Sequence, residues 1–200
     1  MYSLENISDI TVGASALGTF FVALYGVRGW SRELRGKANF DISQRILKEV
    51  YSYRNAMQLA RSLKITNKTS DELEKIYFDK DRKSDFLISS LNERWYPVSE
   101  TAQSLASLSI EAEVFLGKEV KDLIDNLVFI ASDLRTSIDV FIDFEVNKPP
   151  HAISFFEENP ICFYNLQSKI TRDLNGEDNL SLEIEKTIEK LEKSIRSNFC

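Results

Sequence analysis

Apolar residues recur at steps of three or four along most of the chain, and no segment shows the sustained apolar–polar alternation of a half-buried strand. The clearest stripe falls on Ile42, Ile46, Val50, Tyr53, Met57 and Ala60. Such steps align apolar side chains on one face of a helix. Only seven glycines and four prolines occur in 200 residues, which favours long helices. The pattern predicts an all-α protein built as a helical bundle.

Turn and capping signals divide this pattern into helices. The first helix is expected to continue to Arg61, with Gly29 and Gly36 as points where it could bend. Pro97 should end the second helix, because proline lacks a backbone N–H. The later helices are expected at residues 70–95, 99–115, 118–141, 161–174 and 180–199, with breaks at 65–70, 147–150 and 175–178.

The last expected helix carries Ile184, Ile188, Leu191 and Ile195 on one seam. This spacing resembles a short coiled-coil face. The seam could be buried within the bundle or could bind a second copy of the chain, and the sequence leaves both alternatives open.

One run of eighteen residues, Ile10–Val27, carries no charge and is bounded by Asp9 and Arg28. As a helix it would be about 27 Å long, close to the thickness of a bilayer's hydrocarbon core. Residues 1–9 contain no lysine or arginine, unlike the start of a secretory signal peptide. The run predicts an N-terminal transmembrane helix, with residues 1–29 as tail and anchor and residues 30–200 as a cytoplasmic α-helical domain. The alternative is a core helix of a soluble helical adaptor.

Small residues form one face of this run, at Ala14, Ser15, Gly18 and Gly26. A small-residue face lets two helix backbones approach closely in lipid. Because the chain has one expected span, the natural partner is another copy or another membrane protein. The face therefore predicts a homo-oligomer. A second interpretation is that this stripe lines a narrow pore in a ring of copies.

The residues expected at the membrane interface follow the run directly: Arg28, Trp30, Arg32, Arg35 and Lys37. Residues 30–64 contain eight basic and three acidic groups, whereas the chain as a whole has a net charge of −6. By the positive-inside rule, the C-terminal side lies in the cytoplasm of a bacterium and the anchor in its inner membrane. The basic stretch suits anionic lipid headgroups. The acidic remainder disfavours binding to DNA or RNA.

The sequence offers little for catalysis or cofactor binding. Phosphate-binding glycine motifs, the GxSxG elbow and the HExxH motif are all absent. The single histidine, His151, could act as a general base beside Glu157 or Glu158, but a histidine packed against Pro150 is the simpler interpretation. Carboxylate pairs such as Glu111/Glu113 and Asp122/Asp125 are typical of solvated helix faces. No catalytic, cofactor or metal site is predicted, and the protein is not expected to be an enzyme.

Two smaller features complete the candidates. Cys162 and Cys200 are far apart and fit free thiols in a reducing compartment. A polar and aromatic cluster at Tyr51, Tyr53, Arg54 and Asn55 could contact a partner. The alternative, which we favour, is that Tyr53 packs inward while Arg54 pairs with an acid across the bundle.

The segment after the uncharged run has a distinctive order of residues: Trp30, Arg32, Leu34, Gly36 and Ala38, then Arg45-Ile46-Leu47 and Tyr53-Arg54-Asn55-Ala56. It resembles uncharacterised bacterial single-pass membrane proteins with a W-x-R-x-L-x-G-x-A segment after the anchor. More weakly, the layout is similar to the small membrane accessory protein of type VI-B CRISPR systems. That likeness implies a HEPN-like helical domain, a ring-shaped assembly and a pore-forming or membrane-perturbing role in phage defence. HEPN ribonucleases carry Arg-x(4–6)-His, and no arginine precedes His151 at that spacing.

The sequence thus predicts a membrane-anchored, self-associating helical scaffold or effector at the bacterial inner membrane. Its partners would be the lipid bilayer, further copies of the chain and a possible protein partner, but not DNA. The alternatives are a degenerate HEPN-like ribonuclease and a soluble helical adaptor.

Overall fold

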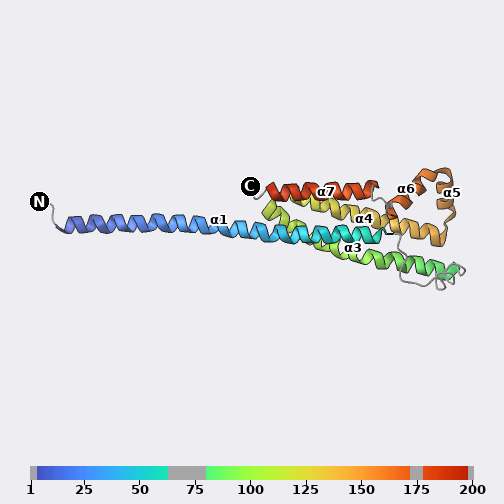
Figure 1. Ribbon diagram of the computed structural model, residues 1–200, viewed down its shortest axis with the longest axis horizontal. Coiled ribbons are helices and arrows are strands. Elements are labelled where there is room, and N and C mark those ends of the chain that lie inside the picture. Colours follow the sequence, from blue (N-terminus) through green and yellow to red (C-terminus); the bar gives the residue numbers. More distant parts are fainter. Residues whose placement is uncertain (1–3, 63–79, 172–177, 198–200) are drawn as a thin grey trace. The chain divides into compact units, whose positions relative to one another are not determined.

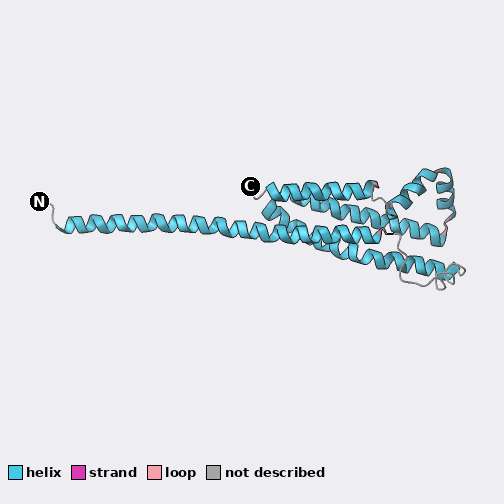
Figure 2. Ribbon diagram, viewed as in Figure 1, coloured by secondary structure: helices cyan, strands magenta, loops and turns pink. Residues whose placement is uncertain are grey.

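The computed structural model describes residues 4–62, 80–171 and 178–197, with side chains from residue 15 onward except at 16 and 80–83. Every regular element in these ranges is a helix, and none is a strand (Figure 2). The helices are α1 (Leu4–Ala60), α3 (Lys80–Leu116), α4 (Lys118–Asn147), α5 (Pro150–Glu158), α6 (Pro160–Ile170) and α7 (Asn179–Ser197) (Figure 1). The all-α fold is therefore confirmed.

The chain divides into two compact units, Met1–Ile42 and Ser43–Cys200. The first unit consists of the N-terminal part of α1, which continues through Gly29 and Gly36 without a break. Within the part of the chain that the structure describes, no helix is both long enough and apolar enough to cross a bilayer. The expected span begins at Ile10, and its side chains up to Ala14, together with Ala16, lie outside those described.

The second unit is a bundle of four long helices: the last part of α1, α3, α4 and α7. Successive helices run in opposite directions (Figure 1). All four contribute fully buried apolar side chains to one core, among them Ile46, Val50, Leu105, Ile124, Leu134, Ile188 and Leu191. The apolar spacing recognised in the sequence therefore serves the interior of this bundle.

The short helices α5 and α6 form a hairpin at the end of the bundle where α1 finishes (Figure 1). Three aromatic rings hold this hairpin to α4. The ring of Phe144 lies 5.0 Å from that of Phe156 and 5.1 Å from that of Phe163, measured between centroids. Edge-to-face and tilted contacts of this kind are favourable between aromatic rings, and all three rings are half-buried. The hairpin thus has a small aromatic core of its own.

The expected helix break at Pro97 is wrong, because α3 runs through this residue. A proline inside a helix removes the hydrogen bond to the carbonyl four residues earlier, which here belongs to Glu93. Both Pro97 and Glu93 are exposed, so water can satisfy that carbonyl. Leu91 and Val98 are buried on either side of the proline and hold both halves of the helix in the bundle.

Other boundaries agree more closely with the expectations. Helix α4 ends at Asn147, where Lys148 adopts the left-handed conformation with φ 44°. Helix α5 was not expected at all, and α6 begins one residue before the predicted position. The turn between α3 and α4 is made by Gly117, whose φ of 95° suits glycine. The expected breaks at 65–70 and 175–177 and the ends at Leu174 and Phe199 lie outside the described residues.

Burial settles the question of the C-terminal seam. Ile184, Ile188, Leu191 and Ile195 are each at most 4% exposed, because α7 turns this face toward the rest of the bundle. The seam is therefore used within the chain and is not available to a second copy.

Candidate functional site

The first unit exposes a continuous run of apolar side chains along α1. Leu17, Val22 and Tyr25 are 62%, 73% and 77% exposed. Residues 17–27 contain no charged side chain. Exposing this many neighbouring apolar groups to water is unfavourable, so the segment, called here the apolar segment, is the first candidate for a functional surface.

The two glycines of the apolar segment lie on one side of the helix. At 3.6 residues per turn, Phe20, Leu24 and Val27 lie on the opposite side, whereas Val22 and Tyr25 share the side of Gly18 and Gly26. A Cβ atom added at either glycine would meet nothing within 4 Å among the described residues. The hydroxyl of Thr19 donates to the carbonyl oxygen of Ser15 (2.9 Å), so this polar group is satisfied within the helix. Of the predicted packing residues, Ala14 has no described side chain.

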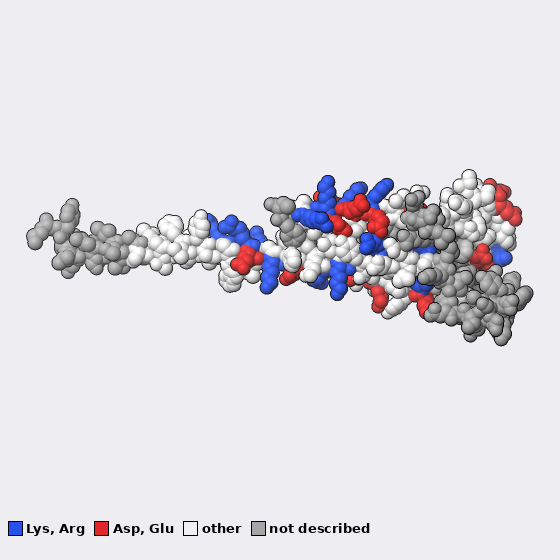
Figure 3. All heavy atoms as spheres, in the orientation of Figure 1, with Lys and Arg blue, Asp and Glu red and all other residues white. Residues whose placement is uncertain are grey.

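Basic residues begin as soon as the apolar segment ends. Figure 3 shows lysine and arginine side chains gathered on α1 directly after an uncharged stretch. The predicted interface residues are all exposed: Arg28, Trp30, Arg32, Arg35 and Lys37. At 3.6 residues per turn, the three arginines lie on one side of α1, and Trp30 and Lys37 lie on the opposite side.

The polar and aromatic cluster of α1 serves the bundle, as the favoured interpretation predicted. Tyr53 is fully buried, and its hydroxyl donates to the carbonyl oxygen of Leu127 (2.7 Å). Arg54 Nη1 lies 3.6 Å from the Glu185 carboxylate on α7. The Tyr51 hydroxyl donates to Glu192, also on α7 (2.8 Å). These contacts fix the face that α1 turns to α7.

A second candidate is a buried arginine at the end of α1. Arg61 is 2% exposed and pairs with Asp178 at 2.7 Å. Its guanidinium also donates to the carbonyl oxygens of Ser168 (3.0 Å) and Lys169 (2.7 Å) and to the hydroxyl of Ser181 (3.0 Å). The carbonyls belong to the last turn of α6, where four groups lack partners within the helix. We call this set of contacts the Arg61 cluster.

The electrostatics of the Arg61 cluster follow from the helix ends that meet there. A cation is favourable at the C-terminus of α6, and a carboxylate at the N-terminus of α7. Asp178 accepts hydrogen bonds from the backbone N–H (3.0 Å) and the hydroxyl (2.8 Å) of Ser181 in the first turn of α7. Burial alone would raise the pKa of Asp178, but the bonds from Arg61 and Ser181 outweigh it and hold this pKa below its usual value.

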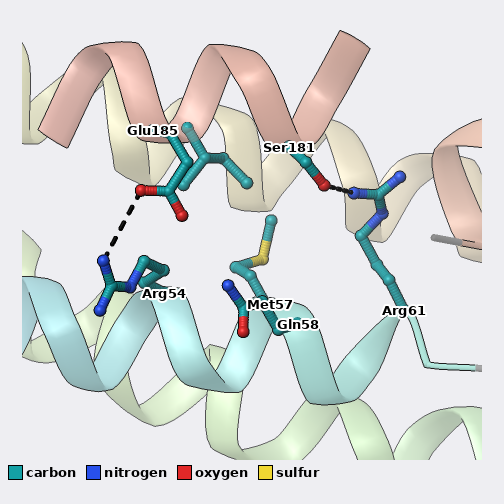
Figure 4. A pocket seen from close by; sticks show the side chains of 7 residues that line it. Arg54, Met57, Gln58, Arg61, Ser181 and Glu185 are labelled. Atoms are coloured by element: carbon teal, nitrogen blue, oxygen red, sulfur yellow. Dashed lines mark hydrogen bonds and ion pairs between the residues drawn. The ribbon is translucent and has the colours of Figure 1, made fainter. Parts of the chain in front are cut away.

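The cavity beside Arg61 is small and is bridged by side chains (Figure 4). Arg54, Met57 and Gln58 approach it from α1, and Ser181 and Glu185 approach it from α7. The ion pair between Arg54 and Glu185 crosses it at one end, and the bond from Arg61 to Ser181 closes the other. These two contacts join the end of α1 to the start of α7 across the cavity.

The candidate catalytic groups remain apart. His151 lies exposed in the first turn of α5, not in a loop, and Glu157 and Glu158 are exposed at the other end of that helix. Over the described residues, no group of three or more His, Cys, Asp or Glu side chains could hold a metal ion.

The expected carboxylate pairs are used in ion pairs on the surface. Glu111 pairs with Arg45 at 2.8 Å, and Glu113 and Asp125 both lie within 4 Å of Lys121.

The Arg61 cluster was missed at the level of the sequence. Asp178 was assigned to a turn, although an aspartate three residues before Ser181 at the start of an apolar-periodic segment is a typical N-cap signal. No sequence signal pointed to the bond between Arg61 and α6, because it joins residues more than 100 positions apart.

Comparison with protein-family models, with curated proteins and with solved structures found no match to this chain. The function proposed below therefore rests on the surfaces of the protein itself.

Proposed function

We propose that the protein is a membrane-anchored helical scaffold, held in a bilayer by Ile10–Val27 and presenting the bundle of Ser43–Cys200 on the cytoplasmic side. It acts by binding and positioning other molecules rather than by catalysis. The observation that carries this proposal is the exposed apolar segment followed at once by exposed basic residues.

The apolar segment exposes apolar side chains on more than one side of α1, so an apolar environment is needed on more than one side. Phe20 and Leu24 are exposed on one side of α1, and Val22 and Tyr25 on another. A single partner helix would cover one stripe of this surface, whereas lipid surrounds a helix completely. The bonded hydroxyl of Thr19 also suits an environment without water. A bilayer therefore satisfies this surface better than one protein partner would.

The charges that follow support both the depth and the direction of the anchor. Trp30 is amphipathic and favours the headgroup region. Arg28, Arg32 and Arg35 lie on the opposite side of α1 within two turns of Trp30, where each can approach anionic lipid phosphates. Positive charge after a span favours a cytoplasmic location for the residues that follow.

Self-association is the second part of the proposal. Gly18 and Gly26 lie on the side of the apolar segment that also carries Val22 and Tyr25, and a Cβ added at either glycine would meet nothing within 4 Å among the described residues. In lipid, close approach of two backbones along such a side is a favourable way for helices to pack. The proposed assembly is therefore a homo-oligomer joined within the membrane.

Membrane fractionation tests the anchor. We expect the full chain to remain with membranes in high salt and in alkaline carbonate, and to dissolve in detergent. A variant lacking residues 2–29 should leave the membrane fraction, whereas the substitution Leu59→Ser, at an exposed apolar residue of the bundle, should not. Retention of the shortened chain in the membrane would contradict the proposal.

A reporter fused after Cys200 tests the orientation. A reporter that is active only in the cytoplasm should work, and one that is active only in the periplasm should be silent. The reverse result would refute the cytoplasmic location of the bundle.

A further inference from the structure

A cavity of about 600 Å³ lies between α4 and α5. Its floor is apolar and is formed by Val140, Phe144, Ala152, Phe155 and Phe156. This volume is within the usual range for binding sites in proteins. These residues come from the last two turns of α4 and the first two turns of α5, so each helix forms one side of a short groove, called here the α4–α5 groove.

The rigid base of the α4–α5 groove comes from the aromatic contacts of the hairpin. Phe156 packs edge-to-face against Phe144 beneath it and against Phe163 of α6. Above this base, Val140 and Phe155 remain 44% and 51% exposed. The groove therefore presents apolar surface on a fixed support, and this surface gains free energy when a partner covers it.

Two of the residues that line the α4–α5 groove are acidic, Asp139 and Asp143, and none is a lysine or an arginine. Asp139 is paired with Arg135 at 2.8 Å. Asp143, one turn further along the rim, accepts a hydrogen bond from the neutral amide of Asn147 (2.7 Å), a contact that leaves its charge uncompensated. His151 lies on the opposite wall. The groove thus complements a ligand that is apolar and positively charged.

The charge at the rim of the groove favours a protein over a lipid as the occupant. Anionic headgroups would be repelled by the carboxylates of the rim, whereas a lysine or arginine of a protein would be attracted to them. The place of the groove at a membrane rests on the proposed function, whereas the groove itself does not.

We propose that the α4–α5 groove binds a basic amphipathic helix of a protein partner. Apolar residues at steps of three and four on that helix would cover Val140, Phe144 and Phe155. A lysine or arginine beside them would reach Asp143 and form an ion pair at the rim. The anchored scaffold would then hold a second protein at the membrane through this groove.

A designed peptide tests the groove without knowledge of the natural partner. The probe is a fluorescein-labelled peptide of about 15 residues, long enough to form a helix on binding, with leucine on one face and lysine on the other. Its binding to the full chain in nanodiscs of uncharged lipid is followed by fluorescence anisotropy, and the signal of empty nanodiscs is subtracted. We expect saturable binding that weakens with added salt, and no binding of the same peptide with glutamate in place of lysine.

Matched variants locate the binding. Val140→Lys and Asp143→Lys should each weaken binding at least tenfold. Val114→Lys is the control, because Val114 is also an exposed valine of the bundle but lies on α3 outside the groove. It should leave binding unchanged, and circular dichroism should show that all three variants keep their helix content.

Three results would overturn the inference. The variants could bind the peptide as tightly as the natural chain, or Val114→Lys could lose as much affinity for it as the groove variants. The groove variants could also keep their affinity for the peptide and lose only binding to vesicles of anionic lipid. None of these depends on whether Ile10–Val27 spans the bilayer. Failure of the groove and failure of the anchor can therefore be told apart.

Discussion

The hydroxyl of Tyr53 donates a 2.7 Å hydrogen bond to the carbonyl oxygen of Leu127, inside the bundle. This bond joins α1 to α4 at a point where both residues are fully buried. A buried hydroxyl without a partner would be costly, so the register between the two helices is set by a polar contact as well as by packing. Burial also raises the pKa of Tyr53, with a smaller contribution from Glu183, and keeps the phenol neutral.

Replacement of Tyr53 by phenylalanine removes this bond and preserves the ring. We expect the free energy of unfolding to fall by about 1 kcal/mol, measured by urea unfolding of the full chain in mild detergent. Tyr51→Phe is the matched control, because the Tyr51 hydroxyl bonds Glu192 at the exposed surface. An equal loss for the two variants would show that burial of the Tyr53 bond has no special effect.

The Arg61 cluster should be the most sensitive polar contact of the bundle. Arg61→Met keeps an apolar chain of similar length but leaves the Asp178 carboxylate and the α6 carbonyls without their cation. We expect a loss of about 3 kcal/mol or more in the free energy of unfolding. Arg45→Met, which breaks an exposed pair with Glu111, should cost less than about 1 kcal/mol. Similar losses of unfolding free energy in Arg61→Met and Arg45→Met would show that the buried Arg61 pair is no more stabilising than the exposed Arg45 pair.

The low pKa of Asp178 makes the contribution of this pair depend on pH. A carboxyl whose pKa is lower in the folded than in the unfolded chain stabilises the fold at pH values above the unfolded pKa, about 3.9. This contribution is lost as the pH falls from there through the folded pKa. We expect the difference in unfolding free energy between the natural chain and Asp178→Asn to be constant near neutral pH and to shrink below about pH 4. A difference that does not change with acid would contradict the pairing.

Gly18 offers a direct test of assembly in the membrane. Because a Cβ at this position meets nothing in the chain, Gly18→Leu should leave the helix content unchanged. If copies pack along this side, the added bulk should shift the oligomer toward smaller species, as measured by mass in mild detergent. Gly36→Leu adds the same bulk outside the apolar segment and should have no effect.

A monomeric natural chain at micromolar concentration would remove the basis for self-association. A Gly18→Leu chain that keeps the oligomer of the natural chain would move the interface elsewhere.

The sequence predicted the bundle well because burial in helices follows a simple period. The stripe from Ile46 to Ala60 and the seam from Ile184 to Ile195 both became core. The helix end expected at Pro97 was wrong because the cost of a proline inside a helix depends on whether water can reach the carbonyl that loses its hydrogen bond. The sequence alone does not show whether that carbonyl is exposed. Helix α5 was missed because it is short and has no buried residue among its nine.

The candidate sites differ in how much of their geometry could be predicted from the sequence. Arg28, Trp30 and Lys37 lie within ten residues of one another in the sequence, so their closeness along α1 is a local property. Arg61 and Asp178 are separated by 117 positions, and their contact depends on the path of the four described helices between them. The α4–α5 groove likewise needs the turn at Lys148–Pro149 to bring its two walls together.

The Arg61 cluster also bears on the order in which the bundle forms. Helices α3 and α4 are joined by the single residue Gly117, so their pairing closes a short loop and can occur early. Every side-chain contact described for Arg61 reaches a residue more than 100 positions away, and the loop entropy for such contacts must be overcome first. We expect α6 and α7 to dock late and to open together. Amide protons in these two helices should then exchange with solvent before those of α3 and α4.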